Sequence, residues 1–131
     1  MTGEKNLNTL IQSMQPKLIE EEYVFCSVPV EEFASLNINP VCLFREEEGI
    51  TLIVSKQQAE LANLDYEYVC RMITLVVHSS LEAVGFLATI TNKLAENNIS
   101  ANAVSAYYHD HLLVPANKAE QAMHILTSMS K

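Results

Sequence analysis

The sequence predicts an α+β fold of two ferredoxin-like (βαββαβ) units with antiparallel sheets, and three observations predict it. The segment Leu52–Glu60 lines up with Leu112–Glu120 at an offset of 60 residues. Each copy of this repeat follows a strand hairpin and precedes a helix pattern. Between the copies, the apolar and β-branched run Met72–Val77 has the length of a strand and leads into an amphipathic helix pattern. Two related units therefore share the chain.

The first unit is expected over residues 18–70, after an N-terminal helical segment over residues 1–17 that Pro16 ends. Its first helix is degenerate, because only Val30–Leu36 stands where that helix should be. Ser55 has N-cap spacing to Gln58 and predicts the start of the second helix. The strands are expected at Tyr23–Val28, Val41–Glu46 and Ile50–Val54, with a turn at Glu48-Gly49.

The second unit is expected over residues 71–131 and lacks its last strand. A single long segment, Tyr66–Val77, is expected to close the first unit and open the second. Ser79 has capping-box spacing to Glu82 and predicts the start of a helix. The remaining elements are a hairpin from Ala103–Tyr108 through His109-Asp110 into Leu112–Val114, and a helix capped at Asn117 with an inner face of Ala119, Ala122, Met123 and Leu126.

Composition narrows the classes of function. With 131 residues, of which 49% are hydrophobic, the chain can form a hydrophobic core without disulfide or metal cross-links. Cys26, Cys42 and Cys70 lie far apart in apolar runs, which indicates small buried side chains in a reducing, cytoplasmic compartment. The net charge is −8 and the basic residues are scattered, so nucleic-acid binding is disfavoured. No signal peptide or membrane-spanning run is present.

The residues that follow Met72–Val77 resemble the β1–loop–α1–β2 core of the ACT domain, the small-molecule-sensing module of many amino-acid enzymes and regulators. The resemblance covers residues 68–130 well and residues 18–68 mainly through the repeat. Paired ACT modules are similar, among them small bacterial proteins built of little else and the regulatory regions of aspartate kinases. In the family the loop usually has an acidic residue followed closely by Pro-Gly, and this chain departs from that pattern. The matching positions are Val84-Gly85-Phe86-Leu87-Ala88, Ile90, Leu94-Ala95-Glu96, Ile99-Ser100 and Asn102.

The resemblance implies a ligand site at the strand-to-helix loop, near an interface between ACT units. The first and third strands of such a sheet are antiparallel neighbours, so the loop after Val77 and the hairpin before Leu112 should lie at the same end. The helix start offers unpaired N–H groups to a carboxylate, and Glu82 or Asp110 can accept hydrogen bonds from an ammonium group. An amino acid fits this arrangement. The expected ligand-binding residues are His78, Ser79, Ser80, Leu81, Glu82, Ala83, Val84, Gly85, Phe86, Tyr108, His109, Asp110 and His111.

Other interpretations of these residues stay open. Ser79 and Glu82 can simply cap their own helix, and Gly85 can serve close packing. His109 and His111 lie two apart on a strand and, with His78 and Asp110, form a weaker candidate for a zinc or nickel site. No phosphate-binding loop, nucleophile elbow or dinucleotide fingerprint is present.

The sequence thus predicts a regulatory or sensor protein that binds a small molecule, an amino acid by preference, and that has no catalytic domain, cofactor or metal. The alternative is a structural protein that only oligomerises through ACT-like sheets. A homo-oligomer is expected, because sheet edges invite pairing and the second unit lacks a closing strand. Neither the effector nor the regulated partner can be read from the residues.

Overall fold

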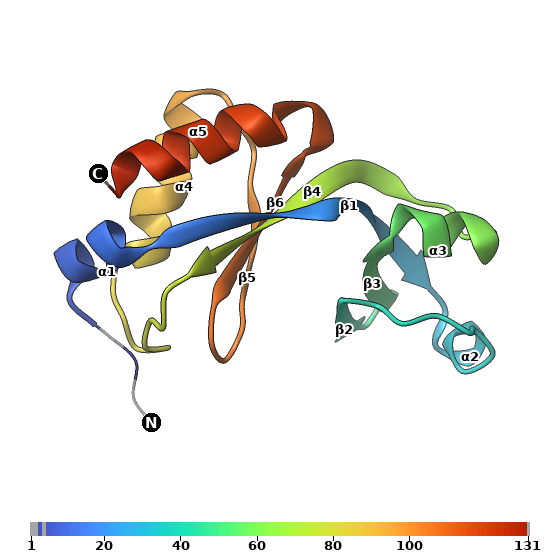
Figure 1. The fold of residues 1–131 in the computed structure, drawn as a ribbon. Coiled ribbons are helices and arrows are strands. Elements are labelled where there is room, and N and C mark those ends of the chain that lie inside the picture. Colours follow the sequence, from blue (N-terminus) through green and yellow to red (C-terminus); the bar gives the residue numbers. More distant parts are fainter. Residues whose placement is uncertain (1–2, 4, 131) are drawn as a thin grey trace. The chain divides into compact units, whose positions relative to one another are not determined.

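The computed structural model describes residue 3 and residues 5–130, and its ribbon is drawn in Figure 1. The strands are hydrogen-bonded in the order β2-β3-β1-β4-β6-β5. The α+β class and the antiparallel strand pairing agree with the prediction. In chain order the elements are α1 (Leu7–Ser13), β1 (Gln15–Val28), α2 (Val30–Phe33), β2 (Cys42–Glu46), β3 (Gly49–Ser55), α3 (Lys56–Leu61), β4 (Glu67–Val76), α4 (Phe86–Glu96), β5 (Asn102–Ser105), β6 (Asp110–Pro115), the 3₁₀ helix η1 (Ala116–Lys118) and α5 (Ala119–Met129).

The chain forms two compact units. One is Glu21–Cys70, here called the central unit, and the other, the terminal unit, combines the described residues up to Glu20 with those from Arg71 on. The long strands β1 and β4 therefore each contribute residues to both units. The partition into residues 1–17, 18–70 and 71–131 stays a prediction.

The central unit is a complete βαββαβ unit. Its four strands follow the order β2-β3-β1-β4, which is the ferredoxin-like order. The first helix, α2, is a single turn, as the degenerate pattern predicted. Ser55 caps α3, with its hydroxyl oxygen accepting a hydrogen bond from the Gln58 backbone N–H at 3.3 Å. The core is made of alternate residues of β1 and β3 with one alanine of α3: Val24, Cys26, Val28, Ile50, Leu52, Val54 and Ala59.

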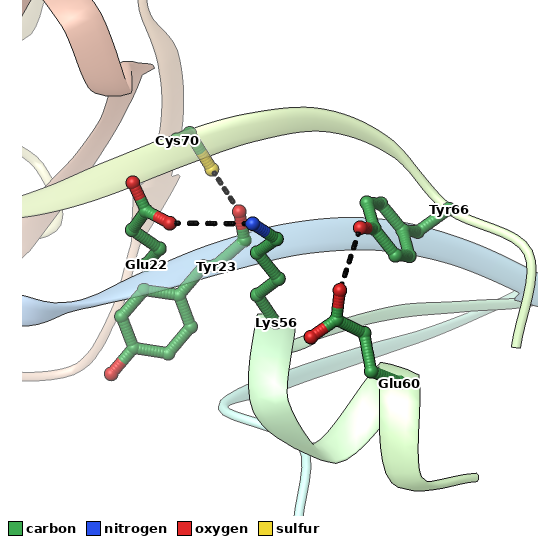
Figure 2. A network of polar contacts seen from close by, with 6 residues as sticks. All are labelled: Glu22, Tyr23, Lys56, Glu60, Tyr66 and Cys70. Carbon is green, nitrogen blue, oxygen red and sulfur yellow. Dashed lines mark hydrogen bonds and ion pairs between the residues drawn. The ribbon is translucent and has the colours of Figure 1, made fainter. Parts of the chain in front are cut away.

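Two cysteines of the central unit are buried, as predicted, while Cys42 is only half-buried. Figure 2 shows the Cys70 thiol, which donates a hydrogen bond of 3.2 Å to the Tyr23 carbonyl. Burial, with a smaller contribution from the Glu22 carboxylate, raises the pKa of Cys70 to about 11. Cys70 therefore stays a neutral thiol at physiological pH and has the properties of a small core residue rather than a nucleophile.

The terminal unit takes its closing strand from the start of the chain. Its strand order is β1-β4-β6-β5, with β1 in the place that a strand after α5 would occupy. As predicted, no strand follows α5 in the part of the chain that the structure describes. The expected start of β1 at Tyr23 is wrong, because the strand begins at Gln15. The glutamate-rich run after Leu18 has weak strand propensity, and pairing with β4 stabilises it.

Three helices cover one face of the terminal sheet. In Figure 1, α4 and α5 can be followed on the same side of β4 and β6. Leu10 of α1 is fully buried in this core together with residues of both other helices. The buried set is Leu10, Met14, Ile73, Leu75, Phe86, Ile90, Leu94, Ile99, Leu112, Val114, Ala119, Ala122 and Leu126.

The internal repeat is confirmed by equivalent burial in the two units. Leu52 and Leu112 are both fully buried, each in its own core. Ala59 and Ala119, also 60 residues apart, are buried in the two following helices. The predicted cap at Asn117 is wrong, because a 3₁₀ turn over Ala116–Lys118 precedes α5, whose N-terminus has no side-chain cap.

Candidate functional site

The segment between β4 and α4, residues 77–85, is here called the site loop. Figure 1 shows it at the same end of β4 as the turn between β5 and β6. The two are joined by a 3.2 Å contact between His109 Nδ1 and the Val77 carbonyl oxygen, and the rings of His78 and Tyr108 lie 5.7 Å apart. The expectation that the loop and the hairpin meet at one end of the sheet is confirmed.

The predicted helix start at Ser79 is wrong. The helix α4 begins at Phe86, and the loop forms a tight turn in which the Ser80 hydroxyl oxygen accepts a hydrogen bond from the Glu82 N–H at 3.0 Å. Gly85 precedes the helix with a φ of 87°, in the left-handed region that a glycine adopts at little cost. The local turn thus competes successfully with the capping box.

Because Gly85 is the N-cap residue, no side chain caps α4. The first N–H groups of this helix have no partner within the helix, and the helix dipole adds a partial positive charge there. This end of α4 is therefore suited to an anionic group.

A cavity of about 80 Å³, here called the Asp110 cavity, lies between the site loop, α4 and the hairpin. It is lined by Ser79, Ser80, Leu81, Ala83, Phe86, Leu87, Ser105, Ala106 and Asp110. Three serines and one carboxylate are thus brought to the start of α4.

Asp110 is 8% exposed and lies on the core face of β6, two residues before the buried Leu112. The structure gives its carboxylate no hydrogen bond with any of the described residues. Among those residues no fully buried side-chain oxygen lacks a partner, so the Asp110 oxygens keep access to the cavity. A buried carboxylate without a donor is costly, which suits it to a donor supplied by a ligand.

A second depression of about 270 Å³, here called the Glu82 hollow, shares the Ser79–Leu81 segment with the cavity. The Lys5 Nζ atom lies 3.5 Å from the Glu82 carboxylate. The lining residues are Gly3, His78, Ser79, Ser80, Leu81, Glu82 and Tyr107.

Sequence reasoning therefore found most of the lining, although some of the expected residues lie apart from it. Val84 is 85% exposed, and Gly85, Tyr108, His109 and His111 line neither depression. The expected strand over Ala103–Tyr108 is too long, because β5 ends at Ser105. Tyr107 and Tyr108 lie in the turn between β5 and β6 and are exposed.

Five lining residues were missed by the sequence analysis. The position of Leu87 could be predicted from the helix pattern once α4 is known to begin at Phe86. The positions of Ser105 and Ala106, at the end of β5, could be predicted from the register of the hairpin. Gly3 has no local signal, because its place against the loop depends on the path of the N-terminal segment. The five are Gly3, Leu87, Ser105, Ala106 and Tyr107.

The histidines of the hairpin are engaged with protein atoms. His111 Nδ1 lies 3.0 Å from the Thr74 hydroxyl, and the rings of His109 and His111 are 6.5 Å apart. Among the residues that the structure describes, no three His, Cys, Asp or Glu side chains form a group able to hold a metal ion.

Burial lowers the pKa of His111 below its ordinary value of 6.5, and His109 lowers it further, while Asp110 acts in the opposite direction. The folded protein therefore disfavours the charged form of His111. The free energy of unfolding is therefore higher above pH 6.5 than below it. It decreases as the pH falls from 6.5 through the lower folded-state pKa, because only the unfolded chain readily takes up the proton.

We expect His111→Gln to flatten the decline of stability between pH 7 and pH 5, since glutamine does not titrate there. Urea unfolding of both proteins across this pH range measures the effect. His124→Gln is the matched control, because His124 lies on α5 and outside the hairpin. An equal decline in wild type and His111→Gln would contradict the assignment.

A family model described as "ACT domain" matches residues 2–71, and a second model with the same description matches residues 66–128. No curated protein sequence matches the chain. No helix within the described residues is long and apolar enough to span a membrane.

Several solved structures are also similar to this chain. A Vibrio cholerae protein of unknown function, called a possible transport protein, is 43% identical, with 97% of this chain and 98% of that chain covered and a TM-score of 0.84. The ligand-free regulatory subunit of aspartate kinase from Thermus thermophilus is 12% identical, with 92% and 99% covered and a TM-score of 0.69. The corresponding subunit from Thermus flavus is 11% identical, with both chains fully covered and a TM-score of 0.63. The two aspartate kinase subunits share the fold, and the family models reach across both units, so the chain belongs to the ACT domain family.

Proposed function

We propose that this protein is a non-catalytic regulatory protein that binds a small amino acid in the Asp110 cavity. Membership of the ACT domain family supports a ligand-binding regulatory role. The observation that carries the choice of ligand is the Asp110 carboxylate, which is buried, has no hydrogen bond with a described residue and faces a cavity at the uncapped start of α4.

Two features of the cavity lining suit the two charges of an amino acid. The Asp110 carboxylate would accept hydrogen bonds from the α-ammonium group, as in other charge-assisted pairs. The first N–H groups of α4 would donate to the α-carboxylate. Ser79, Ser80 and Ser105 supply hydroxyl groups to the same cavity. No lysine or arginine lines the cavity, so a ligand with a carboxylate alone would meet Asp110 without compensation.

The size of the cavity selects a short side chain. One water molecule needs about 10–15 Å³ of such space, so a cavity of about 80 Å³ has room for roughly five to eight water-sized groups. Glycine, alanine and serine are of this size. Pockets for drug-sized ligands measure roughly 300–1,000 Å³, so a large effector is disfavoured.

A ligand in the Asp110 cavity would contact both the site loop and the β5–β6 turn, and would strengthen the link that His109 and Val77 already make between them. A ligand bound between two segments favours the conformation in which both contact it. The loop belongs to the terminal unit. We expect the regulated enzyme to be a separate chain in the same reducing compartment, since the described aspartate kinase neighbours include regulatory subunits.

We expect Asp110→Asn to weaken alanine binding by roughly tenfold to a hundredfold, because the neutral amide loses the charge-assisted hydrogen bonds. Isothermal titration with glycine, alanine and serine measures the affinity. Glu82→Gln is the control, because Glu82 does not line the Asp110 cavity. Unchanged affinity in a folded Asp110→Asn protein would exclude this site.

The proposed position of the ligand α-carboxylate, at the start of α4, is tested by the matched pair Gly85→Asn and Gly85→Asp. Both side chains are strained at the left-handed φ of 87°, but Asn and Asp share this cost and meet only ordinary contact, since the nearest non-neighbouring atom to an added Cβ is Leu7 Cδ2 at 3.9 Å. The aspartate should stabilise α4 by about 0.3–1 kcal/mol relative to asparagine through the helix dipole. The same charge should repel the ligand carboxylate and lower the alanine affinity.

Opposite changes of stability and affinity would therefore support the proposal. If Gly85→Asp and Gly85→Asn bind alanine equally well, the ligand carboxylate does not lie at the start of α4. Thermal unfolding and titration of the same two preparations supply both measurements.

We further propose that the protein is a homo-oligomer. The terminal unit needs no strand from a partner to close its sheet, because β1 supplies that strand. The edge strands β2 and β5 still present one unpaired side each, and Phe44 on β2 is 66% exposed.

Sedimentation at tens of micromolar, roughly the range of ordinary self-association, should detect dimers or larger species. Phe44→Lys should lower their fraction, because a lysine on an edge strand opposes strand pairing. Leu61→Lys, at an exposed position on α3, is the control. A monomer at all concentrations would contradict the proposal.

A further inference from the structure

We propose that the Glu82 hollow is a second binding site, specific for primary alkylammonium ions, and that Lys5 acts there as a competitor within the same chain. The proposal does not depend on amino-acid binding in the Asp110 cavity. The two depressions share the Ser79–Leu81 segment, yet only the Asp110 cavity is lined by Asp110 and only the Glu82 hollow by Glu82.

One wall of the Glu82 hollow is aromatic. His78 and Tyr107 line it, and both rings contact the Tyr108 ring, at centroid distances of 5.7 and 4.9 Å. Tyr107 and Tyr108 are 63% and 60% exposed, so these rings are held together at the surface and add little to the core. The faces of tyrosine rings attract cations.

A carboxylate adds negative charge to the Glu82 hollow. The Glu82 side chain lines the hollow and is 79% exposed, and the whole chain has a net charge of −8. Leu81 adds an apolar surface for an alkyl stem. Aromatic rings, an apolar contact and a carboxylate around about 270 Å³ suit an organic cation better than an anion or a neutral ligand.

The structure already places a primary ammonium group at this carboxylate, since Lys5 Nζ lies 3.5 Å from Glu82. Gly3, two residues before Lys5 in the chain, lies close against the site loop. A Cβ atom on Gly3 would lie 2.5 Å from the Ser79 carbonyl carbon, so only glycine permits this approach.

Lys5 can be displaced from this position. Its side chain is 58% exposed, and exposed ion pairs contribute only about 0.2–1 kcal/mol. A free alkylammonium ion in the hollow would pair with Glu82 in place of Lys5. Binding there would break the Lys5–Glu82 ion pair.

The probe is n-butylammonium chloride, which is the Lys5 side chain without its backbone. Titration followed by NMR should give saturable shifts at Tyr107 and Glu82, with a Kd on the order of 1–10 mM, as expected for a small exposed cation site. Lys5→Ala should tighten binding by up to about fivefold, the equivalent of one surface ion pair. Glu82→Gln and Tyr107→Leu should each weaken it by a few-fold.

Butan-1-ol and butyrate, at matched concentration and ionic strength, are the neutral and anionic controls. Equal shifts with butan-1-ol would overturn the proposal, since they would show apolar contact alone. An unchanged affinity in both Lys5→Ala and Glu82→Gln would also overturn it. Asp110→Asn should leave butylammonium binding intact, so failure of the amino-acid site and failure of this site give different results.

Discussion

The terminal unit depends on the pairing of β1 with β4. Without residues 15–20 of β1, the β4 edge of this sheet would be open, and the helix that precedes the strand would lose its position. That helix, α1, contributes the fully buried Leu10 to the same core as α4 and α5. The fixed core in turn holds the start of α4 next to β6. The geometry of the candidate site therefore rests on a strand at the far end of the sequence.

The site itself is built from features that oppose stability. Asp110 occupies a core-face position of β6 where an apolar residue would be favoured, and Gly85 leaves α4 without a side-chain cap. Each feature costs folding free energy. A ligand with an ammonium group and a carboxylate would satisfy both, which is the expected arrangement at a binding site. A purely structural loop has no such requirement.

Much of the fold was predictable because the repeat and the hydrophobic periodicity are local. Burial of Leu52 and Leu112, and of Ala59 and Ala119, follows from the 60-residue offset. The position of Asp110 near the site loop follows from the antiparallel arrangement of ferredoxin-like sheets. The error at Ser79 has a local cause as well. The predicted capping box pairs Ser79 with Glu82, but the Glu82 N–H donates to the neighbouring Ser80 hydroxyl, and the helix begins only after Gly85 at positive φ.

By itself the sequence determined the class of fold, the repeat and the end of the sheet where the loop and hairpin meet, since these follow from periodicity and chain order. Tertiary structure alone decided that β1 closes the terminal unit and that Gly3 and Lys5 lie against the site loop. Gly3 and Ser79 are far apart in the chain, and contacts at that separation leave no periodic pattern. They depend on backbone pairing and on the shape of a core that forms only when the whole unit folds.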